Sequence, residues 1–123
     1  MTGILRICEY LSISQMVKLM KVIPSTRKGK KWTAYFKMPD GKEKAVSFGA
    51  VGYRDYTLIS DKKSKFYLKT KVERTKVKTA YIARHSKEVQ TDPTTPATLS
   101  RYILWQNPNF GGAIRDFKKR FKV

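Results

Sequence analysis

The stretch WTAYFKMPDGKEKAVSF, residues 32–48, decides the fold of this chain. Residues 32–38 are rich in β-branched and aromatic side chains, and the Pro-Asp-Gly-Lys sequence at residues 39–42 is a strong turn signal. Residues 45–48, Ala-Val-Ser-Phe, are again strand-like and can pair back on the first run. The stretch therefore predicts an antiparallel β-hairpin.

A further strand is expected on the N-terminal side of the hairpin. Residues 16–23, MVKLMKVI, have the composition of a short strand, and the Pro-Ser-Thr sequence at residues 24–26 ends it. A basic loop, residues 27–31, leads into the hairpin. We therefore expect an antiparallel meander of two or three strands.

The patterned sequence begins at about residue 16, so we expect residues 1–15 to form an N-terminal arm and residues 16–123 a single small basic domain. The arm could be a short helix or an extended segment, and it could dock on a neighbouring protein or on its own core. Residues 4–13 are apolar, but Arg6 and Glu9 interrupt a run far shorter than the roughly 20 residues of a membrane span. We expect a soluble protein made inside the cell.

Residues 61–88 carry the densest positive charge, and their propensity is mixed between helix and strand. We favour a helix, capped by Ser60 or Asp61 and free of Pro and Gly until Pro93, which would be about 40 Å long. Its narrow apolar stripe would consist of Leu68, Val72, Thr75, Thr79 and Ile82. The preceding glycines at positions 49 and 52 indicate a tight connection out of the sheet, without the spacing of a phosphate-binding loop.

Two short helices are predicted after a turn-rich link. Thr95 and Pro96 supply an N-cap followed by proline at the first helical position, and this helix should run over residues 96–105 until the Asn-Pro-Asn sequence breaks it. Phe110, Ile114, Phe117 and Phe121 then mark a last amphipathic helix whose aromatics face the core, with Arg115, Lys118, Lys119 and Arg120 on its polar side. The fold class is therefore α+β: a small antiparallel meander, a long basic helix and two short C-terminal helices.

The strongest compositional signal is charge, because 27 Lys and Arg oppose 9 Asp and Glu and leave a formal net charge of +18. Such a surplus predicts an anionic partner, since the charge otherwise only adds self-repulsion to a compact chain. The residues expected to form the basic binding surface are Arg27, Lys28, Lys30, Lys31, Lys62, Lys63, Lys65, Lys69, Lys71, Arg74, Lys76, Lys78, Arg84, Lys87, Lys118, Lys119 and Arg120. Trp32 and Trp105 are candidate apolar anchors beside them.

The sequence offers little for catalysis, so we expect no enzyme, no cofactor, no metal site and no small-molecule substrate. Cys8 is the only cysteine and His85 the only histidine, so one chain cannot form a disulfide or a Cys/His zinc site, which fits a reducing compartment. The aspartates are scattered and lack the spacing of a two-metal carboxylate cluster. Asp55 is expected to form a local helix cap or an ion pair.

Several short motifs occur in a recognisable order: FGAVGYRDYT at residues 48–57, YIARH at 81–85, TDPTT at 91–95 and LWQNP at 104–108. Together they resemble a family of small, basic, uncharacterised proteins encoded by large nucleocytoplasmic DNA viruses, including viruses of algae. The resemblance spans residues 31–121, and residues 1–15 and 65–79 depart from the pattern. The family has no assigned activity, so no catalytic residue is carried over.

The resemblance implies a viral origin and a place in the virion, with synthesis in the host cytoplasm or nucleus. It implies a minor capsid protein whose partners are the major capsid protein and other minor capsid proteins. The residues leave alternatives open, because the same cations suit anionic lipid head groups or, interleaved with aromatics, sequence-independent binding of nucleic acid.

Overall fold

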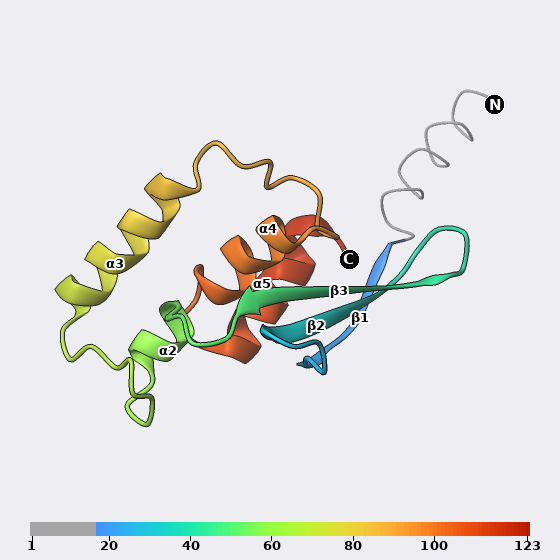
Figure 1. Cartoon of the computed structure of the whole chain (residues 1–123). Coiled ribbons are helices and arrows are strands. Elements are labelled where there is room, and N and C mark those ends of the chain that lie inside the picture. Colours follow the sequence, from blue (N-terminus) through green and yellow to red (C-terminus); the bar gives the residue numbers. More distant parts are fainter. Residues whose placement is uncertain (1–16) are drawn as a thin grey trace.

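The computed structural model describes residues 17–123 (Figure 1). The expected arm at residues 1–15 lies outside the described residues. Three strands are followed by helical segments that continue to the C-terminus, in the α+β arrangement that the sequence predicts. None of the helices within residues 17–123 is long and apolar enough to cross a bilayer.

The sheet is a meander of β1 (Lys18–Pro24), β2 (Lys30–Lys37) and β3 (Glu43–Ala50), antiparallel and in that order. In the register of the hairpin Lys37 faces Glu43, and the intervening turn is closed by a 2.8 Å hydrogen bond from the Met38 backbone N–H to the Lys42 carbonyl. Gly41 holds the turn at φ 83°, a conformation that favours glycine. The predicted hairpin and the third strand are confirmed.

One face of the sheet builds the core. Alternate residues of β2 and β3 point to this face, and the C-terminal helices cover it (Figure 1). These helical segments are α4 (Pro96–Leu99), η1 (Ser100–Leu104) and α5 (Phe110–Phe121). The buried side chains at the interface are Ala34, Phe36, Val46, Phe48, Leu99, Ile103, Leu104, Trp105, Ala113 and Phe117.

The C-terminal helices follow their sequence signals closely. The Thr95 side chain accepts a hydrogen bond from the Thr98 backbone N–H and caps α4, with Pro96 in the first turn. The predicted helix over residues 96–105 is present, but its second half, η1, is a π-helix. In α5, Phe117 is buried and the basic residues are exposed, so the predicted amphipathic orientation is confirmed.

The choice of helix over strand in the basic stretch is confirmed, but the predicted start at Ser60 or Asp61 and the predicted length of about 40 Å are wrong. Two helices occur there instead, α2 (Tyr56–Ser60) and α3 (Lys71–Arg84), and the second has 14 residues, or about 21 Å. Asp61 follows the end of α2, and its carboxylate accepts from the Lys63 backbone N–H in a turn.

A second local signal places the start of α3. Thr70 and Glu73 form a capping box, in which the Thr70 hydroxyl accepts from the Glu73 N–H and donates to the Glu73 carboxylate. The predicted apolar stripe is consequently misplaced: Leu68 precedes the helix, Val72 is 79% exposed, and Val77 and Tyr81 pack against the core.

Gly49 fixes a close approach between the sheet and η1. Its φ is +78°, and a Cβ at this position would lie 2.9 Å from Leu104 Cδ1. We expect Gly49→Ala to lower the free energy of unfolding by about 2–4 kcal/mol, from backbone strain plus overpacking. Gly41→Ala is the matched control, since its φ is +83° and nothing lies within 4 Å.

The Gly41→Ala control should lower the free energy of unfolding through backbone strain alone, by about 1–2 kcal/mol. Urea unfolding of the two variants measures the difference. Equal losses would show that η1 does not constrain this end of β3.

Candidate binding surface and cleft

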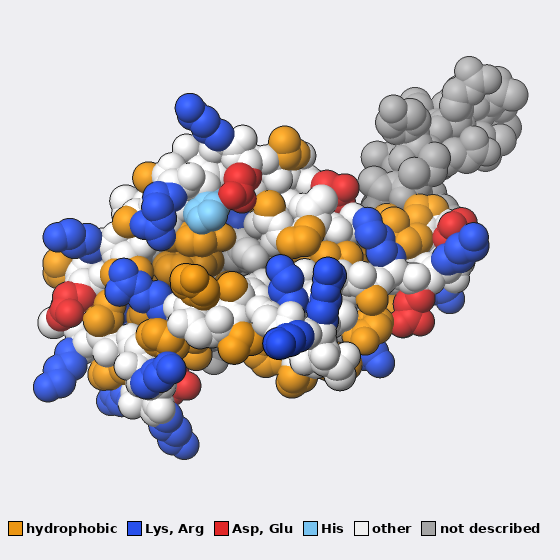
Figure 2. Space-filling view, viewed as in Figure 1, with side chains coloured by type: hydrophobic (Ala, Val, Ile, Leu, Met, Phe, Trp, Pro, Cys, Tyr) orange, Lys and Arg blue, Asp and Glu red, His pale blue; other side chains and the backbone are white. Residues whose placement is uncertain are grey.

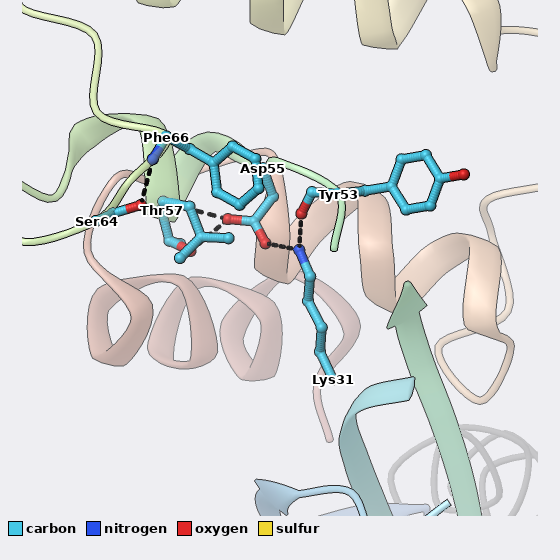
Figure 3. Close-up of polar contacts among 7 residues, drawn as sticks. Lys31, Tyr53, Asp55, Thr57, Ser64 and Phe66 are labelled. Atoms are coloured by element: carbon cyan, nitrogen blue, oxygen red, sulfur yellow. Dashed lines mark hydrogen bonds and ion pairs between the residues drawn. The ribbon is translucent and has the colours of Figure 1, made fainter. Parts of the chain in front are cut away.

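Three of the predicted surface cations are used by the fold itself. Lys31 on β2 is the clearest: its Nζ donates to Asp55 Oδ2 at 2.7 Å and to the Tyr53 carbonyl at 2.5 Å (Figure 3). The Lys31 side chain is only 13% exposed and that of Asp55 2%. Asp55 also caps α2 by accepting from the Leu58 N–H at 2.9 Å, so the expected cap and ion pair are both confirmed, with Lys31 as the partner.

Arg74 and Lys78 on α3 also act within the domain. Arg74 Nη1 donates to the Leu68 carbonyl at 2.6 Å, which ties α3 to the loop before it. Lys78 Nζ donates to the Gln106 carbonyl at 3.0 Å and lies 4.7 Å from the centre of the Tyr56 ring. Burial, and secondly the positive charge of Arg101, lowers the pKa of Lys78. These three side chains are therefore engaged within the domain and are not free to bind a partner: Lys31, Arg74 and Lys78.

The remaining predicted cations project outward from several elements (Figure 2). Lys30 is half-buried at the start of β2, and the others are exposed. They lie on the β1–β2 loop, on the segment between α2 and α3, on α3 and the turn after it, and on α5. The exposed members are Arg27, Lys28, Lys62, Lys63, Lys65, Lys69, Lys71, Lys76, Arg84, Lys87, Lys118, Lys119 and Arg120.

Four of the carboxylates in residues 17–123 accept backbone N–H groups in turns or caps, and none of the carboxylates described forms an ion pair with these exposed cations. Asp40, Asp61 and Asp92 each accept a backbone N–H two residues ahead. The backbone N–H of Thr94 is the main reason that the pKa of Asp92 is lowered. Within residues 17–123 one carboxylate forms an ion pair with a lysine or arginine, Asp55 with Lys31, and Glu88 contacts His85 Nδ1. The positive surface is therefore left largely uncompensated.

A cleft of about 580 Å³ gathers some of these cations between the end of the sheet and α3. Its rim includes Lys30 and Arg84, which the sequence identified, and Arg54, which it did not. The one sequence signal for Arg54 is its position next to Asp55, the residue expected to cap a helix. Apolar side chains from β3, α4 and η1 also line the cleft: Ala50, Ala97 and Leu104.

Stacked rings form one side of the cleft. Tyr81 on α3 stacks on Trp105 with ring centres 4.2 Å apart and planes 7° apart, and its ring also lies 4.3 Å from that of His85. Burial, with Glu88 as a smaller contributor, raises the pKa of Tyr81 to about 12. His85 Nδ1 in turn contacts the Glu88 carboxylate.

The two tryptophans do not behave as the predicted apolar anchors. Trp105 is 5% exposed and belongs to the core, so its side chain cannot anchor a partner. Trp32 is partly buried and stacks on Phe110 with ring centres 4.3 Å apart. The Trp32 ring thus joins β2 to α5, and the Trp105 ring joins the end of η1 to α3. Their burial depends on contacts far apart in the sequence, which composition does not reveal.

Within residues 17–123, no three His, Cys, Asp or Glu side chains come together as a metal site.

The model of a family of unknown function, DUF5754, matches residues 20–70. The match covers β1 from Met20 onward, β2, β3, α2 and the segment before α3. No curated protein and no solved structure matches the chain.

Proposed function

We propose that this chain is a virion structural protein, a minor capsid protein that binds under or between major capsid subunits through its basic surface. One observation carries the proposal: several carboxylates are engaged in turns and caps, and within residues 17–123 most lysines and arginines are exposed and form no ion pair. A compact domain with a net charge of +18 gains stability when an anionic surface neutralises these groups. The viral setting comes from the sequence resemblance.

The spread of the cations suits a protein that several neighbours surround. They project from elements on different sides of the domain, from the β1–β2 loop through α3 to α5. Exposed charge at the rim of an interface accelerates association and sets orientation more than it sets affinity. The partners are the major capsid protein and other minor capsid proteins, contacted through their acidic surfaces.

Binding of nucleic acid is the alternative, because the exposed lysines between α2 and α3 could contact phosphates. Stacking of bases needs open ring faces. Here both tryptophan rings are engaged within the domain, Trp32 on Phe110 and Trp105 on Tyr81. The engagement of the two tryptophans is the observation that favours a protein partner.

Quantitative mass spectrometry of purified particles tests the proposal. The chain should be present in many copies per particle and should remain with the capsid shell when the genome is released and digested with nuclease. Absence from particles would overturn the proposal. Loss together with the digested genome would support the nucleic-acid alternative instead.

A further inference from the structure

The cleft between the sheet and α3 has the size of a ligand site. Its volume of about 580 Å³ falls inside the range of roughly 300–1,000 Å³ typical of binding pockets. Lys30 comes from β2, Arg54 from the connection after β3, and Arg84 from the last turn of α3. The fold thus brings three cations from distant parts of the sequence together at one opening.

The acidic groups beside this opening are already engaged. Asp55 is held by Lys31 and by the N-terminus of α2, and Glu88 contacts His85. Within residues 17–123, Lys30, Arg54 and Arg84 form no ion pair. The rim can therefore accept carboxylates from outside, and guanidinium groups such as those of Arg54 and Arg84 can do so through two parallel hydrogen bonds.

The apolar lining of the cleft can accommodate an aliphatic side chain. Ala50, Ala97 and Leu104 contribute small or aliphatic groups. The Tyr81 ring stacks on Trp105 and lies tilted against His85, with ring centres 4.3 Å apart, so it is engaged within the domain. Tyr53 also lines the cleft, and its side chain, 71% exposed, points away from the Lys31–Asp55 pair (Figure 3).

We propose that this cleft binds an acidic peptide segment of a partner protein, with one aliphatic side chain inserted between flanking carboxylates that pair with Lys30, Arg54 and Arg84. The inference rests on the proposed function and specifies the chemistry of the partner: a segment rich in Asp and Glu around a single apolar residue. Charge complementarity at the rim and the apolar interior select this occupant together.

Fluorescence anisotropy with the full chain tests the site, using three labelled probes: the peptide EELEE, the peptide EESEE with the same charge, and a five-nucleotide oligothymidine. We expect EELEE to bind at least about tenfold more tightly than either of the others, since the leucine alone contributes about 1.4 kcal/mol or more. Equal affinity for the two peptides would overturn the proposal by showing charge attraction alone. Tighter binding of the oligonucleotide would also overturn it.

Two variants locate the binding. Arg54→Gln combined with Arg84→Gln should weaken EELEE binding by at least about tenfold, because it removes both guanidinium groups that pair with the peptide carboxylates. Lys37→Gln combined with Lys42→Gln removes the same charge from exposed positions of the β2–β3 hairpin, outside the cleft, and should leave binding within about twofold. Circular dichroism checks that both variants are folded, and equal effects of the two pairs would place the peptide elsewhere. These titrations use the isolated protein. A negative result would therefore reject the peptide site without rejecting the proposed place in the virion, which mass spectrometry of particles tests.

Discussion

Replacement of Asp55 by alanine is expected to lower the free energy of unfolding by about 3–5 kcal/mol, the typical effect of removing one partner of a buried ion pair. The Asp55 side chain is 2% exposed and holds Lys31 Nζ at 2.7 Å while it caps α2. The change leaves the Lys31 ammonium with the Tyr53 carbonyl as its remaining partner and removes the cap from α2. Urea unfolding, followed by circular dichroism, measures the loss.

Two comparisons make this result specific. Asp61→Ala removes an exposed aspartate from a turn and should lower stability by less than about 1 kcal/mol. Lys31→Met added to Asp55→Ala should recover part of the loss, because no buried charge is then left unpaired. Additive losses in the double variant, or a loss for Asp55→Ala no greater than for Asp61→Ala, would show that the ion pair does not join β2 to α2.

Neutralisation of the four lysines between α2 and α3 should have the largest effect on binding. The change of Lys62, Lys63, Lys65 and Lys69 to glutamine removes exposed charges that form no ion pair within residues 17–123. Stability should stay within about 0.5 kcal/mol per substitution of the wild type. Affinity for a polyanion should fall, and for random duplex DNA the salt dependence should become shallower by about 0.9 log per log of salt for each phosphate that is no longer neutralised.

Lys78→Met is the comparison variant for the four-lysine change, because it removes a positive charge that is hydrogen-bonded within the domain. It deletes the hydrogen bond to the Gln106 carbonyl and should weaken folding while changing polyanion affinity by less than the four-lysine variant does. Filter binding across a salt series, with thermal unfolding of the same samples, separates the two effects. If the four-lysine variant unfolds while its affinity stays unchanged, the assignment of these lysines to binding is wrong.

The parts of the fold with strong local signals could be predicted from the sequence. The turn around Gly41 fixes the hairpin, and the Thr95–Pro96 pair fixes the start of α4. The spacing of Phe110, Ile114, Phe117 and Phe121 sets the orientation of α5. In each case backbone preference and hydrophobic pattern agree.

The middle of the chain is harder to predict because two local signals compete there. Asp61 can cap a helix or close a turn, and it follows the end of α2 in a turn. The Thr70–Glu73 capping box, which starts α3, is visible in the sequence and would have given the right boundary. Helix propensity alone does not resolve such a choice.

The sequence could not predict which cations are free to contact a partner, because this depends on tertiary structure. Lys31 meets Asp55, 24 residues away, and Lys78 meets the Gln106 carbonyl, 28 residues away. Trp105 belongs to the core, where Tyr81 of α3, 24 residues earlier, stacks on it. Charge density therefore identifies a basic protein, and the folded arrangement decides which cations can reach a partner.

The most direct test is the copy number of the four-lysine variant in purified particles, measured by quantitative mass spectrometry in cells where it replaces the wild-type chain. We expect the variant to be folded and soluble in the cell but at least about tenfold depleted from particles. Incorporation at the wild-type level would contradict it, because the exposed positive charge of this segment would then have no part in assembly.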